Sequence, residues 1–367
     1  MEFIYLKRRV NSLSNCDFIK DGFKLSETYH GIKDIAPISL KIAINAYFST
    51  YSAIRYNFKP IESPSYYKNT VEDTDKLYSS TYYKFYAETI THFHHFIELM
   101  LKRILQSKHQ LLLGEITDSV LLYKVLSNQV NLNDIENYNI KALSFRETLS
   151  RVCDLVKADI ISKSTFDFIL KSRKWLEDLN ELRNRLLHRG MYILRYKSLD
   201  KLVGKYIFPF IIKIVDIYHD EIPERYWKYK KINCNIDPIS EIMKAFKQNS
   251  YDMGKIALLK EMGRAAYNNN LPNEYLEKYQ RNEYIKVYEK AALAFKLGIN
   301  KVKKCPVCGL KTLIIYEESD GDQNNDGSYD AWWTYIWKVR CIHCSFELHN
   351  EIKNASGYGY NNIEDWF

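Results

Sequence analysis

The sequence predicts a mainly α-helical protein that ends in a small β-rich module. Apolar residues recur at helical spacing along most of the chain between residues 35 and 297. After residue 300 this pattern gives way to two β-rich segments that lie between two C-x2-C pairs. We therefore expect a helical bundle, a helical connector and a compact ribbon held by cysteines.

Composition and charge describe a globular protein with a mild positive charge. Of the 367 residues, 46% are apolar and 27% are charged. The net charge of +8 fits contact with nucleic acid, but it is equally typical of a solvated lysine-rich surface. The 30 tyrosines could stack on unpaired bases or fill the core and its interfaces.

Neither a secretory signal nor a membrane span is predicted. The first residues contain no apolar run of signal-peptide length, and Lys213 and Asp216 interrupt the most apolar segment, 206–218. Four of the seven cysteines form pairs with metal-binding spacing, which favours a reducing compartment over a disulfide framework. We expect a cytoplasmic protein that does not bind membranes.

The chain divides into five parts by composition and pattern. In order, we expect a mostly helical N-terminal extension, a helical bundle, a helical connector, a ribbon and a tail, at residues 1–70, 71–222, 223–300, 301–350 and 351–367. In the extension a helix at 35–55 precedes a loop at 56–67. In the connector, Asp237 and Pro238 mark a helix start, and the Asn-rich segment 268–272 marks a break.

The bundle contains about five predicted helices. They cover residues 80–108, 115–126, from 144, 164–189 and from 198, with a polar Asn-rich loop at 128–139. In the first, an apolar stripe runs along Tyr86, Ile90, Phe93, Ile97, Leu101 and Ile104. Ser144 and Glu147 form a capping box that starts a helix.

The segment 179–190 gathers the most chemically active side chains of the bundle. Leu176, Leu179, Leu182 and Leu186 predict an amphipathic helix that Gly190 ends. Arg183 and Asn184 lie in its last turns, and His188 follows one turn later. On an ideal helix Arg183 and His188 point about 140° apart. They can serve one site only if the helix loosens or if a second copy of the chain completes the pocket.

This Arg-x4-His pattern, with Asn after the Arg, resembles the motif of the HEPN superfamily, the helical ribonuclease domains of bacterial toxins, defence systems and CRISPR effectors. The segment 96–102 is similar to the end of the first core helix in that family. The resemblance covers the bundle and implies a homodimer that cuts RNA without a catalytic metal, as a toxin or antiviral effector. It also implies a silencing antitoxin or a sensor protein as partner, and it implies that Glu98 holds Arg183 or His188.

The residue types suit cleavage of RNA. The 2′-hydroxyl of RNA is the nucleophile, so the protein needs to supply only a proton acceptor and donor and a positive charge. His188 suits general acid and base catalysis, and the Arg183 guanidinium suits the charge that develops on phosphorus. Asn184 would orient His188 or the substrate, while Arg185 and Arg189 add positive charge for RNA binding. Cleavage by the 2′-hydroxyl leaves a 2′,3′-cyclic phosphate.

Two alternatives remain open for these residues. Glu98 could instead pair with Lys102 one turn later on the helix surface. The bundle could also be a non-catalytic adaptor that binds RNA or protein, with Arg183 paired to Glu98. His92, His94 and His95 invite a metal site but lack a convincing fourth ligand, so surface or core-edge positions are favoured.

The C-terminal module has the spacing of a zinc ribbon. Its predicted ligands are Cys305, Cys308, Cys341 and Cys344, and Gly309 relieves the turn after the first pair. Four thiolates close the shell of a tetrahedral ion, so we expect structural zinc. Lys338, Arg340 and Trp333 suit RNA binding, although protein docking uses the same residue types.

Overall fold

The computed structural model describes residues 35–127, 129, 141–190, 192–271, 278–295, 301–323 and 329–367. The predicted extension is therefore described only from residue 35, and the Asn-rich loop at 128–139 lies outside the described residues apart from Gln129. The predicted class is confirmed at its coarser level. The protein is mainly helical, with a small antiparallel four-stranded sheet near the C-terminus.

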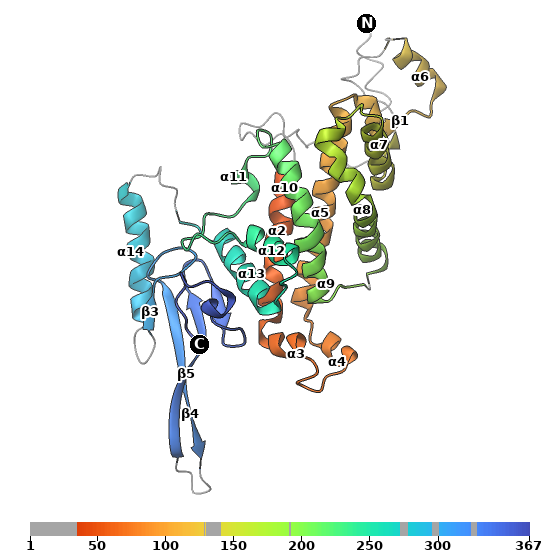
Figure 1. The fold of residues 1–367 in the computed structure, drawn as a ribbon. Coiled ribbons are helices and arrows are strands. Elements are labelled where there is room, and N and C mark those ends of the chain that lie inside the picture. The colour runs from red at the N-terminus through yellow and green to blue at the C-terminus, as the bar shows by residue number, and fades with distance from the viewer. Residues whose placement is uncertain are drawn as a thin grey trace, which may run out of the picture.

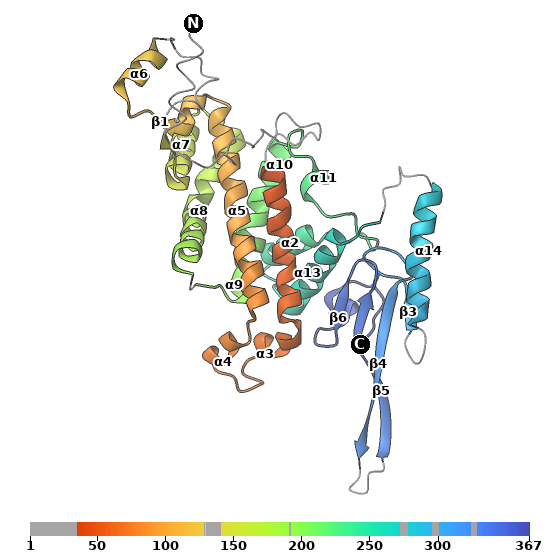
Figure 2. The same cartoon turned by 180° about the vertical axis from the view of Figure 1, so that it is seen from behind.

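Long helices lie side by side in the bundle (Figures 1 and 2). They are α5 (Ser80–Gln106), α7 (Phe145–Lys157), α8 (Lys163–Arg189) and α10 (Phe208–Ile217), joined by α2 (Ala36–Ile54), which was expected in the extension but packs along α5. A short helix, α9 (Tyr196–Lys201), and a π-helical segment (Leu202–Ile207) lead without interruption into α10. The whole predicted stripe of α5 is buried, namely Tyr86, Ile90, Phe93, Ile97, Leu101 and Ile104.

Local signals set the ends of the motif-bearing region. Ser144 and Glu147 form the predicted capping box, since the Ser144 N–H donates to Glu147 and the Glu147 N–H donates to Ser144 Oγ. Helix α8 runs unbroken to Arg189, and Gly190 ends it in the left-handed region at φ +65°. The last helical stretch begins at Tyr196, two residues before the predicted Ser198.

The predicted loop at 56–67 is more ordered than its prolines indicate. A 3-10 turn (Arg55–Asn57) and the short helix α3 (Phe58–Glu62) occupy its first half, because Phe58 and Ile61 pack into the core. Helix α4 (Val71–Lys76) follows. Beyond α5 come a 3-10 turn (Gln110–Leu113), strands β1 (Gly114–Glu115) and β2 (Lys141–Ala142), and helix α6 (Ser119–Leu126).

The connector packs directly against the bundle. It consists of α11 (Glu224–Trp227), α12 (Pro238–Lys247), α13 (Met253–Tyr267) and α14 (Lys278–Ala294). Helix α13 approaches α2 so closely that a Cβ on Gly263 would lie 2.3 Å from the Phe48 ring. Its Lys260 is fully buried and forms an ion pair with the equally buried Asp200 of α9. A charged pair and a close backbone approach therefore fix this contact.

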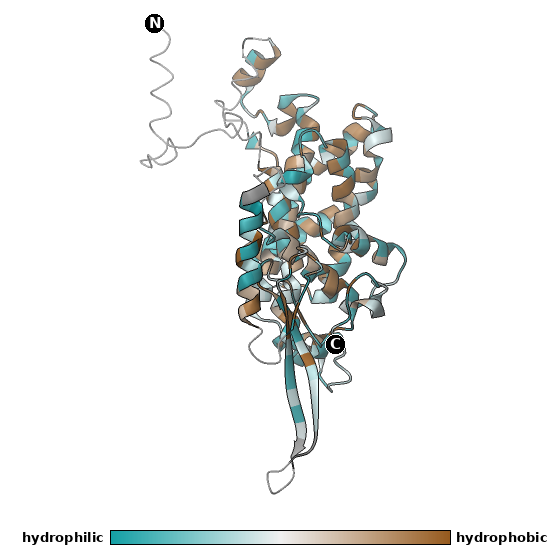
Figure 3. Ribbon diagram, turned by 90° about the vertical axis from the view of Figure 1, so that its left-hand side faces the viewer, coloured by the Kyte–Doolittle hydropathy of each residue, from teal (hydrophilic) through white to brown (hydrophobic). Residues whose placement is uncertain are grey.

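The ribbon is an antiparallel sheet in the order β3 (Lys301–Lys303), β4 (Leu313–Gln323), β5 (Tyr329–Cys341) and β6 (Glu347–His349). Its long β4–β5 hairpin extends well beyond the helical body (Figure 3). The segment expected as a tail contains a 3-10 turn (Ala355–Tyr358) and packs on the ribbon, where the rings of Trp366 and Phe346 lie 6.0 Å apart. Buried residues of bundle, connector and ribbon belong to one continuous apolar cluster.

Candidate functional site

Helix α8 presents a polar position to α5 at Asn180. The preceding contact residues Leu176 and Leu179 are fully buried, and Asn180 is buried as well. Its Oδ1 lies 3.0 Å from Nε2 of His94 on α5. A buried amide requires a hydrogen-bonding partner, so this bond fixes how the two helices face each other.

His94 is the centre of a short polar chain on α5. Its Nδ1 lies 3.8 Å from Oε2 of Glu98, and its ring packs on Phe145 of α7 at 4.4 Å between centroids. Burial lowers the pKa of His94 below its usual 6.5, against the opposing effects of the Asn180 hydrogen bond and the Glu98 charge. This lowering favours the neutral imidazole, whose Nε2–H donates to Asn180 while Nδ1 lies near Glu98 without a hydrogen bond to it.

Arg183 and Asn184 open onto a pocket beside this chain. Nη1 of Arg183 donates to Oδ1 of Asn184 over 3.1 Å. The pocket has a volume of about 390 Å³, within the range of small-ligand sites. Three helices line it, with His94, Glu98, Ser144, Phe145, Arg146, Asn180, Glu181, Arg183 and Asn184.

The charges of this pocket suit an anion at one end. Arg183 and Arg146 provide two guanidinium groups, and the first turn of α7 adds the positive end of a helix dipole. Glu98 of α5 and Glu181 of α8 also line this pocket. Both carboxylates are already paired, Glu98 with Lys102 and Glu181 with Arg185 and, at 4.0 Å, with Arg146, so an anion is favoured beside Arg183.

Glu98 does not pair with the arginine of the motif. Its Oε1 accepts from Lys102 over 2.6 Å, which is the surface pairing expected as the alternative, and its Oε2 faces His94. Within the described part of the chain, no ion pair joins Glu98 to Arg183 or His188. Glu98 and Arg183 share a pocket without contacting each other.

His188 lies outside this pocket. It occupies the last turn of α8 with its side chain exposed to solvent, as does Arg189. The helix does not loosen before it, because the Gly190 N–H still bonds the carbonyls of Arg185 and Leu186. Within one chain, Arg183 and Asn184 therefore open onto the pocket and His188 does not, although Asn184 precedes His188 by one helical turn.

Arg185 connects the pocket to the end of the helix. Its Nε donates to Oε1 of Glu181 over 3.0 Å, and its guanidinium lies over the ring of Tyr192, 5.3 Å from the centroid. The predicted RNA-binding residue Arg185 is thus held beside the pocket, while Arg189 is free of such contacts in the described chain.

Four buried cysteines at the base of the ribbon are positioned to bind a metal ion. The sulfurs of Cys305 and Cys344 lie 3.6 Å apart, those of Cys308 and Cys341 3.7 Å, and all four lie within 4.8 Å of one another. Bonds of about 2.3 Å to a tetrahedral zinc would separate the sulfurs by about 3.8 Å. The predicted ligand set is brought together, and its spacing fits that ion.

The turn after each cysteine pair uses left-handed backbone. Gly309 has φ +80°, as its place after Cys308 predicts, and Ser345 takes the equivalent position after Cys344 with φ +58°. A Cβ on Gly309 would lie 2.7 Å from Oδ1 of Asn233 in the connector. Glycine is thus required both by the turn and by this close approach.

The predicted RNA-binding residues of the ribbon lie among rings and carboxylates. Nζ of Lys338 lies 4.6 Å from the centroid of the Tyr316 ring, and Arg340 pairs with Glu347 at 3.5 Å. Trp333 is about half exposed on the long hairpin, opposite Asp320 in the strand register. These residues are accessible, but acidic side chains of β4 accompany them.

Sequence reasoning did not assign a role to His94 or Asn180. A signal was present, because His94 precedes Glu98 by one turn and Asn180 precedes Asn184 by one turn. Each therefore lies on the same helix face as a residue already singled out from the sequence, Glu98 or Asn184. That these two faces meet is a property of the packing of α5 on α8.

Comparison of the chain with protein-family models, with curated proteins and with solved structures finds no match. Among the described helices, none is both long and apolar enough to cross a membrane. The functional argument therefore depends on the geometry of the site and on the chemistry of its residues.

Proposed function

We propose that this protein is a metal-independent endoribonuclease similar to the HEPN ribonucleases. The observation that carries the proposal is the pocket in which Arg183 and Asn184 of α8 face His94 and Glu98 of α5. The order of elements also supports it, since the motif helix precedes the last helical stretch of the bundle. A guanidinium pair at the start of α7 and the end of α8 is well suited to a phosphodiester.

The reaction uses the 2′-hydroxyl of RNA as nucleophile. The imidazole of His188 takes its proton, the 2′-oxygen forms a bond to phosphorus, and the bond from phosphorus to the 5′-oxygen breaks. The leaving 5′-oxygen takes up a proton from a solvent water, and the His188 imidazolium then returns its proton to the hydroxide that is left. Arg183 donates to the phosphorane oxygens where charge develops. The products are a 2′,3′-cyclic phosphate and a 5′-hydroxyl.

We infer that the active protein is a homodimer. Arg183 opens onto the pocket and His188 is exposed on a regular helix, so one chain does not bring both to the same phosphodiester. A second copy placed with its α8 against the first would supply the missing imidazole. His94 and Asn180 then act as positioning residues for the face that carries Arg183.

The ribbon has a structural role in this proposal. Cys305, Cys308, Cys341 and Cys344 would hold zinc with a closed shell, which leaves no position for an activated water. Because uncontrolled cutting of RNA harms the host, we also propose a toxin or antiviral effector that a silencing partner or sensor holds inactive, by analogy with the HEPN family.

The test is incubation of the purified full chain with mixed RNA in buffer with EDTA, after which the zinc content of the protein is measured. We expect cutting to persist, to leave cyclic phosphate ends, and to fall at least about 100-fold in Arg183→Ala and in His188→Ala. His219→Ala, a change at an exposed histidine outside the site, serves as the matched control. Cutting that survives in both site variants would overturn the proposal.

The shared site is tested by mixing the two inactive variants. In a mixed dimer, one composite site combines the intact Arg183 of one chain with the intact His188 of the other. Activity should therefore return on mixing and co-refolding Arg183→Ala with His188→Ala. If the mixture stays inactive while dimers form, the dimeric arrangement is wrong.

A non-catalytic adaptor is the second candidate. It is favoured by the exposed Trp332 and Trp333 on the long hairpin, which are typical of a docking surface. In the same assay, RNA that is bound and shifted but intact would support the adaptor.

A further inference from the structure

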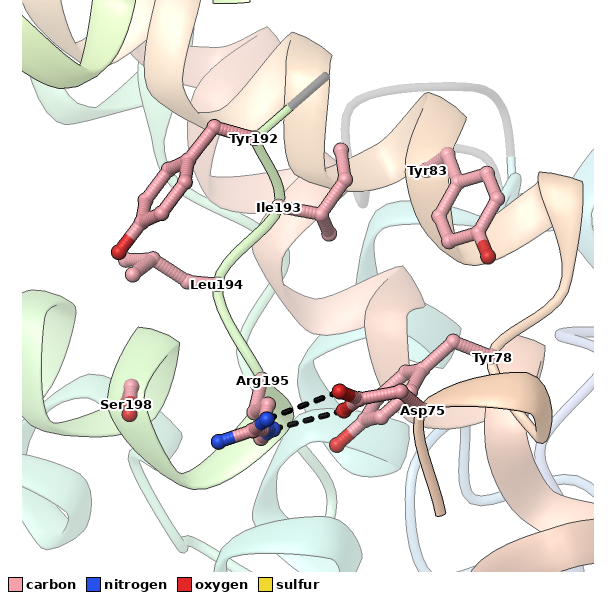
Figure 4. Close-up of a pocket in the computed structure, with 8 residues that line it drawn as sticks. All are labelled: Asp75, Tyr78, Tyr83, Tyr192, Ile193, Leu194, Arg195 and Ser198. Atoms are coloured by element: carbon pink, nitrogen blue, oxygen red, sulfur yellow. Dashed lines mark hydrogen bonds and ion pairs between the residues drawn. The ribbon is translucent and has the colours of Figure 1, made fainter. Parts of the chain in front are cut away.

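A second pocket lies at the end of α8 (Figure 4). It has a volume of about 350 Å³ and is lined by Asp75, Tyr78, Tyr83, Tyr192, Ile193, Leu194, Arg195 and Ser198. The segment 192–195 comes directly after the helix that carries the motif, and Tyr83 comes from the first turn of α5. We call it the tyrosine pocket.

Two tyrosine rings of this pocket are left open to solvent. Tyr83 and Tyr192 are each 42% exposed, whereas the neighbouring Tyr82 and Tyr86 on α5 are fully buried. In Figure 4 the two exposed rings stand on either side of Ile193, and Leu194 lies beside the ring of Tyr192. Exposed rings at the walls of a hollow are the usual platforms for unpaired nucleobases.

The pocket also holds hydrogen-bonding groups in fixed positions. Nε and Nη2 of Arg195 donate to the two oxygens of Asp75 over 2.7 and 2.8 Å. The third guanidinium nitrogen is not used by this pair and points toward Ser198 in Figure 4. The backbone N–H of Leu194 interacts with the Tyr86 hydroxyl oxygen, whereas in the described chain the N–H of Ile193 donates to no partner and remains available to a ligand.

The tyrosine pocket is physically linked to the candidate active site. The ring of Tyr192 lies under the guanidinium of Arg185, and Arg185 is bonded to Glu181, which lines the first pocket. Arg185 of α8 therefore connects a residue of the first pocket to a residue of the tyrosine pocket.

We propose that the tyrosine pocket binds an unpaired nucleobase of RNA, next to the nucleotide that is cut. The base stacks on Tyr192 or Tyr83, and its edge meets the backbone N–H of Ile193 and the open side of Arg195. That the bound RNA is also the substrate rests on the proposed ribonuclease function. Binding of a base is independent of that function, because it requires only aromatic rings, hydrogen-bond donors and a pocket of sufficient volume.

The test uses a fluorescent single-stranded 2′-O-methyl oligonucleotide, which lacks the nucleophile and is not cut. Binding to the full chain is measured for Tyr83→Ala, Tyr192→Ala and the matched surface control Tyr66→Ala. A stacked base accounts for about a 5- to 150-fold change in affinity. We expect that loss in at least one pocket variant and wild-type affinity in the control. Tyr192→Phe keeps the ring and should retain binding, and thermal unfolding checks that each variant is folded.

An oligonucleotide with one abasic position provides the decisive comparison. If its missing base is the one in the pocket, the wild type should lose affinity for it by the same factor that Tyr192→Ala or Tyr83→Ala loses for the intact strand. A pocket variant should lose no further affinity for the abasic oligonucleotide, because the base and the ring belong to the same contact. Binding of this kind without any RNA cleavage would overturn the ribonuclease and leave the base site standing. Cleavage and binding that are both unchanged in the pocket variants, or no oligonucleotide binding at all, would overturn the base site.

Discussion

His94 of α5 and Asn180 of α8 are joined by a buried hydrogen bond of 3.0 Å between positions 86 residues apart in the chain. Both side chains lie beside the pocket that contains Arg183. The bond therefore couples the packing of the bundle to the position of the arginine that we place at the phosphodiester.

Loss of one partner of this bond should cost stability and activity. Asn180→Ala leaves a buried imidazole nitrogen unsatisfied, so we expect the free energy of unfolding to fall by about 1–3 kcal/mol. Cleavage should fall too, because Arg183 follows Asn180 by one turn. Urea unfolding and RNA cleavage measure the two effects. As a control, the double change His94→Phe with Asn180→Leu should regain stability, and a double variant less stable than Asn180→Ala would contradict this account.

His94 should make the protein less stable in mild acid. Burial lowers its pKa in the folded state below 6.5, so the unfolded chain takes up a proton first as the pH falls. The contribution of His94 is therefore fully present above pH 6.5 and is lost below it, by up to about 1.4 kcal/mol per pH unit. The free energy of unfolding of the wild type should fall more steeply between pH 6.5 and 5 than that of His94→Gln. Equal pH dependence in the wild type and His94→Gln would show that His94 does not cause this loss of stability.

The zinc content of the protein should depend on the four cysteines of the ribbon and not on the other cysteines. We expect about one zinc per chain, lost in Cys341→Ser because three thiolates no longer close a tetrahedral shell. Cys153→Ser is the matched control, since Cys153 is buried in the bundle, away from the cluster. Metal analysis measures the zinc content of each variant, and circular dichroism of the full chain checks that it is folded. Retention of zinc in Cys341→Ser would argue against the assigned ligands.

The buried pair of Lys260 and Asp200 should be the most sensitive contact between bundle and connector. Asp200 also accepts from Tyr47 and Tyr251, each at 3.1 Å, and burial lowers the pKa of Lys260 to about 8. Asp200→Asn leaves a buried ammonium without its counter-charge, which costs about 3–5 kcal/mol. Asp200 is one of the groups that raise the Lys260 pKa, so this pKa should fall further in the variant.

The sign of the pH effect follows from this shift. In the unfolded chain Lys260 keeps its proton up to about pH 10.4, whereas in the folded protein it releases the proton near pH 8. Between these two pH values the unfolded state binds more protons, so the free energy of unfolding rises with pH. The free energy of unfolding of Asp200→Asn should therefore recover as the pH rises, and a flat profile would count against it. Asp75→Asn, which breaks an exposed pair with Arg195, should cost much less.

Much of the fold was predictable because its signals are local. The capping box at Ser144 and the stop at Gly190 depend on residues within one turn of each other, and both are confirmed. The apolar stripe of α5 and the pairing of β4 with β5 follow from periodicity. The first half of the loop expected at 56–67 is helical instead, because Phe58 and Ile61 gain more from burial in the core than Pro60 costs near the start of the short helix.

By itself, the sequence determined which residues could share a helix face or a metal. The spacing of Cys305, Cys308, Cys341 and Cys344 is enough to predict a four-sulfur cluster, because each short pair bends back on itself. Only the tertiary structure decided that His94 meets Asn180, that Glu98 turns to Lys102 rather than Arg183, and that His188 lies outside the pocket. The reason is physical. Spacing fixes directions within one element, whereas contacts between elements depend on how whole faces pack, and no single residue encodes that choice.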